Sequence, residues 1–302
     1  MNIGHFNARG FNDVEHWFTI INRELSSRGH EVRHFNLRAQ RPLKWDIEWM
    51  DFGVMHFSQV AHFYRKMGIP FCVLPSANDC LVDDGKRLKE VSEHPNCKFV
   101  TYQSAFHLRK YNEWGIKPPY VYVPMPARVN LFQRETPLGN KIIAGGRLIP
   151  KKGLHQLKDV ENLTIFGDGP LKQELEKQLP NAEFVGWLDG KELKELMEDS
   201  WLFLCPSVIT SDGDSEGIPN TIKEAMLMNL QVIASDVGGI NEFENISLFN
   251  DWNRINGCID VTERNPNWKG MKEITHMYSP EHCVNLLMEG IEKYGTYRKK
   301  KV

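Results

Sequence analysis

The chain has 302 residues, a length that fits two domains of about 150 residues better than one small domain. Hydrophobic residues make up 41% and charged residues 25% of the sequence, which excludes a disordered or fibrous protein. The formal net charge of -2 argues against nucleic-acid binding driven by bulk positive charge.

Short apolar runs alternate with amphipathic stretches along most of the chain, a pattern typical of βαβ units and parallel sheets covered on both faces. A first series of strands is predicted at 1–6, 31–35, 52–57, 70–74, 98–102 and 120–124, with helices at 13–28 and 104–113. A second series is predicted at 141–146, 163–167, 183–186, 201–205, 231–235 and 257–261, with helices at 170–178, 190–198, 220–229 and 279–295.

The two series are separated by residues 123–140, which contain three prolines and few periodic apolar positions. This composition indicates an interdomain linker. We therefore predict an α/β protein with two Rossmann-like domains that face each other across a cleft. The first domain is expected at 1–128 and the second at 129–279, with the C-terminal helix 280–302 packing back on the first.

Two further features bear on the location of the protein. The N-terminal sequence lacks the basic region and apolar run of a signal peptide, and no stretch approaches the roughly 20 apolar residues of a membrane span. The six cysteines form no CxxC pair and indicate neither a zinc site nor a disulfide framework. We expect a cytoplasmic protein with a solvated basic tail at 297–302, and a peripheral contact with the inner face of a membrane is the alternative for that tail.

The sequence AGGRLIPKKG at 144–153 runs from a predicted strand through paired glycines to Arg147 and Lys152. Gly146 lets the backbone approach a ligand closely, and N–H groups of the following helix can bind an anion. Arg147 can grip a phosphate with its fork, and Lys152 adds a point charge. The motif indicates a diphosphate site, with an ordinary strand–turn–helix carrying surface charges as the alternative.

The sequence FGDGP ends the next predicted strand with Gly167, Asp168, Gly169 and Pro170. It contains only a GxG, which is a weak dinucleotide fingerprint, and Pro170 suits the first position of a helix. The motif nevertheless lies at the carboxyl end of a strand, where open α/β sheets bind ligands.

Two glutamates with seven residues between them, Glu216 and Glu224, follow the buried strand at 201–205. Pro219 suits a helix start, so Glu216 is expected at the helix N-terminus in a loop that lines an open cleft, beside the N–H groups of Gly217 and Ile218. Such carboxylates could accept hydrogen bonds from the vicinal hydroxyls of a sugar or ribose. The alternatives are a solvated helix face for Glu224 and a helix-start acid favoured by the dipole for Glu216.

The sequence SDVGGINEF follows the strand at 231–235. Gly238 and Gly239 bring the backbone toward the ligand, and Ile240 starts a short helix whose N–H groups could meet a phosphate. A simple loop is the alternative.

These segments resemble, in their order, the retaining glycosyltransferases of family 4, which have the two-domain GT-B architecture. The matching segments are GGRLIPKKG, FGDGPLKQELE, VGWLDGKEL, LCPS, DGDSEGIPNTIKEAM and QVIASDVGGINE. The wording of DGDSEGIPNTIKEAM is similar to bacterial glycosyltransferases of polysaccharide biosynthesis.

The resemblance implies transfer of a sugar from a UDP-, GDP- or ADP-sugar to a hydroxyl of a glycan, a lipid-linked sugar or another macromolecule. It implies retention at the anomeric carbon and neither a metal nor a cofactor. The implied roles are donor-sugar contact for Glu216, ribose binding for Glu224, diphosphate binding for Arg147 and Lys152, nucleobase lining for Gly167 to Pro170 and for Val185, Gly186 and Trp187, and a position near the phosphates and sugar for Gly238 and Gly239. The catalytic residues would be Glu216, Arg147 and Lys152.

The first domain resembles the family less closely. Of the usual glycine-rich loop after strand one only Gly10 is present, and Ser76 and Asn78 stand where the family often has a His. This departure leaves open a degenerate GT-B protein that binds a nucleotide without transferring a sugar. An NAD-dependent oxidoreductase would need a full GxGxxG with a downstream acid, which neither strand series supplies.

Overall fold

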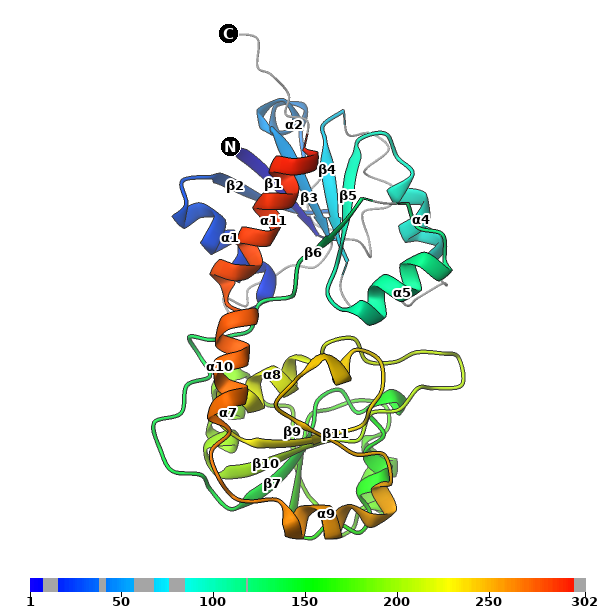
Figure 1. Cartoon of the computed structure of the whole chain (residues 1–302), viewed down its shortest axis with the longest axis vertical. Helices are drawn as coiled ribbons and strands as arrows, with labels where there is room; N and C mark the ends of the chain where they lie inside the picture. The colour runs from blue at the N-terminus through cyan, green and yellow to red at the C-terminus, as the bar shows by residue number, and fades with distance from the viewer. Residues whose placement is uncertain (8–15, 38–41, 57–67, 76–84, 118, 296–302) are drawn as a thin grey trace. The chain divides into compact units, whose positions relative to one another are not determined.

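The computed structural model describes residues 1–7, 16–37, 42–56, 68–75, 85–117 and 119–295. The chain divides into two compact units, of which unit 1 comprises Met1–Pro126 with Tyr278–Val302, and unit 2 comprises Ala127–Met277. Each unit is built on its own parallel sheet with helices on both faces (Figure 1). The predicted α/β class with two Rossmann-like domains is confirmed.

Unit 1 has a sheet with the strand order β2-β1-β3-β4-β5-β6, in which every pair is parallel. Helix α11 packs against α1 and against strands β5 and β6 (Figure 1). The hydroxyl of Ser279 accepts a hydrogen bond at the start of α11, as the hydroxyl of Ser104 does at the start of α5. The elements are β1 (Asn2–Asn7), α1 (Trp17–Ser27), β2 (Glu31–Asn36), α2 (Lys44–Trp49), β3 (Phe52–His56), β4 (Phe71–Leu74), α4 (Lys86–Ser92), β5 (Cys97–Tyr102), α5 (Ala105–Glu113), β6 (Tyr120–Tyr122) and α11 (Pro280–Tyr294).

Unit 2 has a sheet with the strand order β12-β11-β10-β7-β8-β9, also parallel throughout. Its strands are β7 (Lys141–Gly145), β8 (Leu163–Phe166), β9 (Glu183–Gly186), β10 (Ser200–Cys205), β11 (Gln231–Ala234) and β12 (Ser247–Leu248). Its α-helices are α6 (Lys172–Gln178), α7 (Gly190–Glu198), α8 (Asn220–Leu227), α9 (Ile255–Val261) and α10 (Trp268–Met277). Short 3-10 helices are η4 (Pro150–Lys152), η5 (Leu154–Leu157), η6 (Ile240–Glu242) and η7 (Trp252–Arg254).

The strand order of unit 2 identifies where a ligand can bind. The chain proceeds in one direction from β7 through β8 to β9 and then returns to the other side of β7 at β10. Crossovers that start from β7 and β10 therefore leave in opposite directions. The carboxyl ends of these two neighbouring strands form the topological switch point, the place where open α/β sheets bind ligands.

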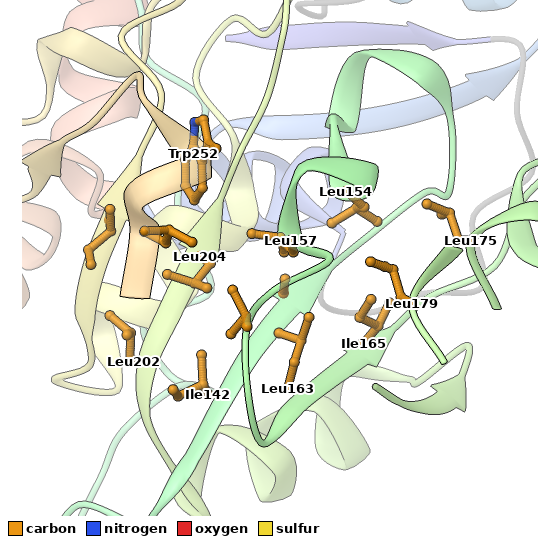
Figure 2. Packing of buried hydrophobic residues seen from close by; sticks show 14 of the residues in the cluster. Ile142, Leu154, Leu157, Leu163, Ile165, Leu175, Leu179, Leu202, Leu204 and Trp252 are labelled. Atoms are coloured by element: carbon orange, nitrogen blue, oxygen red, sulfur yellow. The ribbon is translucent and has the colours of Figure 1, made fainter. Parts of the chain in front are cut away.

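The core beneath this edge is formed by apolar side chains spaced two residues apart on the strands, so that they share one face of the sheet. Each fully buried side chain of this kind contributes about 1.5–3 kcal/mol to stability. Figure 2 shows strand residues packed with residues of η5, α6 and η7 and with the C-cap residue of α6: Ile142, Leu202, Leu204, Leu163, Ile165, Leu154, Leu157, Leu175, Trp252 and Leu179.

Two predicted elements are wrong. Residues 257–261 form part of helix α9 instead of a strand, because Ile255, Cys258 and Ile259 recur at helical spacing and pack on the core, whereas Val261 is exposed. Pro170 is not the first residue of a helix, since α6 begins at Lys172 with Leu171 at its N-cap. The backbone N–H of Lys172 still bonds to the carbonyl of Gly169, which makes a turn ahead of the helix.

Candidate active site

The segment after β7 carries the predicted diphosphate residues to the switch point. Arg147 is exposed, and Lys152 closes the three-residue helix η4. The helix expected after this motif is present as two short 3-10 helices, η4 and η5, which are separated by Gly153 with a positive φ of 59°. Because both helices are this short, the positive charge of the segment comes from the side chains of Arg147 and Lys152 more than from a helix N-terminus.

Lys152 forms an ion pair with Glu216, with 3.0 Å between Nζ and Oε1. Burial opposes the charge on Lys152, but the Glu216 carboxylate outweighs it, so the pKa of Lys152 lies above its ordinary value. Burial would likewise raise the pKa of Glu216, yet the charges of Lys152, Lys151 and Arg147 hold that pKa below its ordinary value. Both groups are therefore charged at neutral pH.

Glu216 occupies a different position from the one predicted. Helix α8 begins only at Asn220, and Glu216 lies in the loop before it, 7% exposed. The expectation of a carboxylate at the helix N-terminus is thus wrong for Glu216, and its side chain is held instead in the ion pair with Lys152. The three residues between Glu216 and α8 are buried as well: Gly217, Ile218 and Pro219.

The Gly238–Gly239 turn fixes the backbone of Glu216 from the other side. The N–H of Gly239 donates to the carbonyl of Glu216 at 3.3 Å. Gly238 has a φ of 62°, and a Cβ there would lie 1.8 Å from the same carbonyl oxygen. Only glycine fits at position 238, and the loop carrying Glu216 is held against the loop after β11. The short helix expected from Ile240 is present as η6.

Glu224 lies along α8 and is 5% exposed, which excludes the alternative of a solvated helix face. Its Oε1 accepts hydrogen bonds from Nε of Arg128 at 3.0 Å and from Nη2 at 2.8 Å. Burial raises the pKa of Glu224 above its ordinary value, with the charges of Arg128 and, less strongly, Lys152 opposing that rise. The field of Lys152 therefore reaches both glutamates of the E-x7-E motif.

The ends of β7, β8 and β9 bring the predicted nucleobase residues together. The N–H of Gly146 donates to the carbonyl of Phe166 at 3.0 Å, and the N–H of Gly167 donates to the carbonyl of Gly186 at 2.6 Å. Gly167 has a φ of 114°, and a Cβ there would lie 1.8 Å from the Gly146 oxygen.

Beyond these strand ends, side chains are left open to a ligand. Asp168 and Pro170 are exposed, Gly169 is half-buried, and Trp187 is 67% exposed beside the half-buried Gly186. An exposed indole at the carboxyl edge of a sheet offers a flat surface on which an aromatic ring can stack.

Three basic residues of the site region were missed from the sequence. Arg128 and Arg134 come from the predicted linker, and Lys151 adjoins Lys152 in η4. Arg134 donates to backbone carbonyls near the ends of α7 and α8, including those of Met228 at 2.7 Å and Glu198 at 3.0 Å. The neighbouring lysines of PKKG were the only available signal, and nothing in the local sequence identifies the arginines' partners.

Other residue groups bear on cofactors and on the first domain. Among the residues that the structure describes, no group of three or more His, Cys, Asp or Glu side chains is placed to hold a metal ion. No helix in this part of the chain is long and apolar enough to cross a membrane. Gly10, Ser76, Asn78 and the basic tail lie outside the described residues.

Comparison with known proteins identifies the class to which this architecture belongs. Over 97% of its length the chain superposes on the whole crystal structure of Anabaena HepE in complex with UDP, with a TM-score of 0.75 and 16% sequence identity. Sucrose-phosphate synthase of Thermosynechococcus elongatus gives a TM-score of 0.75 at 14% identity, covering 97% of this chain and 98% of the other. At these identities the likeness shows the fold, which is that of GT-B glycosyltransferases.

Sequence matches to glycosyltransferases cover part of the chain. Residues 141–255, all in unit 2, match the family model described as Glycosyl transferases group 1. The chain is 32% identical over 136 residues to the amylovoran biosynthesis glycosyltransferase AmsK of Erwinia amylovora, covering 39% of this chain and 33% of AmsK. It is 30% identical over 152 residues to a GDP-mannose-dependent alpha-mannosyltransferase of Mycolicibacterium smegmatis, covering 48% of this chain and 39% of that enzyme.

The predicted resemblance to glycosyltransferases is confirmed at the level of group 1. The segment that matches the group 1 model lies in unit 2. The aligned regions span well under half of these curated relatives. All the residues of the candidate site described above lie in unit 2, and those from Gly146 to Gly239 fall within the matched segment.

Proposed function

We propose that this protein is a retaining glycosyltransferase that moves a sugar from a nucleoside-diphosphate sugar to a hydroxyl acceptor. The observation that carries the proposal is the buried ion pair between Lys152 and Glu216 at the switch point between β7 and β10. A cation and a carboxylate held there can bind different parts of a nucleotide sugar. The cation can bind the diphosphate, and the carboxylate can accept hydrogen bonds from the sugar hydroxyls. The matches to group 1 glycosyltransferases support this assignment.

Donor binding follows from the arrangement of unit 2. The ammonium of Lys152 has three donor hydrogens, of which one is directed to Glu216, so two remain for diphosphate oxygens. Arg147, exposed nearby, supplies a second cation. Glu224 receives the ribose hydroxyls, and the base lies against the edge formed by Gly167 to Pro170, Gly186 and Trp187. Gly238 and Gly239 lie near the phosphates and the sugar.

The chemical step breaks the bond between the anomeric carbon and the diphosphate oxygen. The acceptor oxygen forms its bond to that carbon on the same face of the sugar, and its proton passes to the departing phosphate oxygen. Negative charge grows on the diphosphate as the bond breaks. Lys152 and Arg147 stabilise that charge, so the chain's own cations do the work that a metal ion does elsewhere. Glu216 positions the sugar through its hydroxyls.

The relatives suggest which substrates to test first. HepE was crystallised with UDP-glucose, and the mycobacterial relative is named as dependent on GDP-mannose. AmsK is named for the biosynthesis of a polysaccharide. We propose a carbohydrate acceptor, either a glycan or a lipid-linked sugar reached at a membrane surface, and a role in polysaccharide biosynthesis in the cytoplasm. We do not propose nucleic acid as a partner.

The test is release of nucleoside diphosphate from UDP-glucose, GDP-mannose and ADP-glucose, with and without oligosaccharide acceptors, in the presence of EDTA. We expect turnover of one donor by the wild-type protein. Glu216→Gln is expected to lose at least about 100-fold in kcat, because a positioned charge at the reacting centre is removed. Glu195→Gln, on the exposed face of α7, is the matched control and should retain full activity.

Two outcomes would contradict the proposal. Normal turnover by Glu216→Gln would show that the Glu216 carboxylate is not part of the reaction. Tight binding of a nucleoside diphosphate without turnover of any donor would favour the degenerate nucleotide-binding protein instead.

A further inference from the structure

The loop that carries Glu216 is fastened along its length to one short segment of unit 2. This segment, residues 151–156, contains the last two residues of η4 and most of η5. Nε2 of Gln156 donates to the carbonyl of Pro206 at 2.7 Å, and the N–H of Val208 donates to the carbonyl of Lys151 at 2.8 Å. The same segment supplies Lys152, which pairs with Glu216 at the far end of the loop.

Lys151 makes the contact that fixes the loop immediately before Glu216. The residue is only 2% exposed, and its Nζ lies 2.9 Å from Oδ1 of Asp214 and donates to the carbonyl of Ser215 at 3.3 Å. Two successive lysines thus bind two acids that are two residues apart in the loop. Ser215, whose carbonyl accepts the hydrogen bond from Lys151, immediately precedes Glu216 in the chain.

The acid that receives Lys151 is itself held in a closed turn. The N–H of Thr210 donates to the carbonyl of Asp214 at 2.9 Å, its hydroxyl donates to the same oxygen at 3.0 Å, and the N–H of Gly213 donates to the carbonyl of Thr210 at 2.9 Å. Asp214 therefore has a fixed main chain, and its carboxylate meets a buried ammonium. A buried cation without its anion is strongly unfavourable, so this pair specifies one loop position rather than several.

We propose that Lys151 is a positioning residue for the transfer reaction, holding the Asp214–Ser215 backbone so that the carboxylate of Glu216 meets the donor sugar in its reactive position. This inference rests on the function proposed above. Lys151 does not contact the donor in this account, because its ammonium is engaged by the loop, whereas Arg147 and Lys152 bind the diphosphate. Displacing a reacting group by about 1 Å can cost about 100-fold in rate.

The experiment compares Lys151→Met with a matched ion-pair control in the same unit. Lys194→Met breaks the Lys194–Glu198 pair on α7, at 3.2 Å, and touches none of the loop. For the donor that the wild-type protein turns over, Lys151→Met should lower kcat about tenfold or more while the donor KM stays within about threefold. Lys194→Met should leave both unchanged.

A second variant keeps the test informative if Lys151→Met does not fold. Asp214→Asn keeps a side-chain oxygen that can accept a hydrogen bond from the buried Lys151 ammonium, so this variant should fold, and we expect it to lower kcat with the same unchanged KM because the ion pair is lost. The variant that combines Lys151→Met with the Asp214 substitution should be no slower than Lys151→Met alone, because both substitutions remove the same interaction.

Three results would overturn the inference. Kinetic constants of Lys151→Met equal to those of the control would show that the loop does not need this pair. A loss confined to donor KM would make Lys151 a direct diphosphate ligand. If the wild-type protein turned over no donor, both the proposed function and this inference would be wrong. That result is distinguishable from failure of the inference alone, because it is obtained with the wild-type protein before any variant is compared.

Discussion

Replacing Arg128 by methionine tests whether the buried Glu224 carboxylate depends on its cation. In the native protein two guanidinium nitrogens, at 3.0 and 2.8 Å, bind one oxygen of a glutamate side chain that is 6% exposed. Removing one member of a buried pair costs about 3–5 kcal/mol. Because the Arg128 side chain is itself 21% exposed and water can partly replace it, we expect the lower end, about 3 kcal/mol at pH 8. For a unit of this size that lowers Tm by about 6–12 °C.

The pH dependence of that loss makes the prediction specific. The folded-state pKa of Glu224 is raised by burial, so the folded protein holds this proton more tightly than the unfolded chain does. Stability contributed by this group is therefore present at low pH and is lost as pH rises from the unfolded to the folded pKa. Arg128→Met removes the charge that opposes the rise, so the window extends to higher pH and the loss should be larger at pH 8 than at pH 5.

The assay is calorimetric unfolding at both pH values for Arg128→Met, Arg128→Met with Glu224→Gln, and Lys194→Met. The double variant should recover most of the stability at pH 8, since no uncompensated charge remains. The surface control should lose less than about 1 kcal/mol at either pH. Equal losses by Arg128→Met at pH 5 and pH 8, or a double variant no more stable than the single one, would refute the reasoning.

Two further predictions concern the nucleobase edge. Gly167→Ala should lower unfolding stability by about 1–3 kcal/mol in urea titrations, because a Cβ at this φ of 114° would lie 1.8 Å from the Gly146 oxygen; an unchanged midpoint would contradict the tight turn. Trp187→Ala should change stability by less than about 0.5 kcal/mol, because the indole is 67% exposed, yet weaken nucleoside diphosphate binding about tenfold through lost stacking. Isothermal titration with UDP and GDP measures the second effect, and undiminished affinity would place the base elsewhere.

The features that could be predicted from the sequence are those with local signals. Apolar runs gave the strands, and glycine motifs directly after them gave Gly146, Gly167 and Gly238 at strand ends. Since the carboxyl ends of parallel strands meet at one edge, order along the chain was enough to gather these motifs in one region. The structure brings them together there, while their roles toward a donor remain proposals.

The features that could not be predicted depend on pairs distant in sequence. Arg128 meets Glu224 across 96 positions, and Lys151 meets Asp214 across 63. No periodicity encodes such pairs, because the choice of partner is made by packing. The same limit applies to Glu216. Its polar loop suggests an exposed side chain, and the local sequence does not identify the distant Lys152 with which the buried carboxylate pairs. The strand predicted at residues 257–261 was wrong for a different reason, because a short apolar run fits both a strand and a buried helix.

Thermal stabilisation by nucleotides tests most directly the central claim that unit 2 binds a nucleoside-diphosphate sugar through Lys152. The wild-type protein and Lys152→Met would each be melted with UDP, GDP, ADP and NAD, in EDTA and in magnesium. A ligand at 100 times its Kd stabilises the folded state by about 2.7 kcal/mol. We predict that one nucleoside diphosphate raises Tm equally in EDTA and magnesium, that NAD does not, and that Lys152→Met abolishes this rise in Tm. No rise with any diphosphate, or a rise with NAD alone, would contradict it.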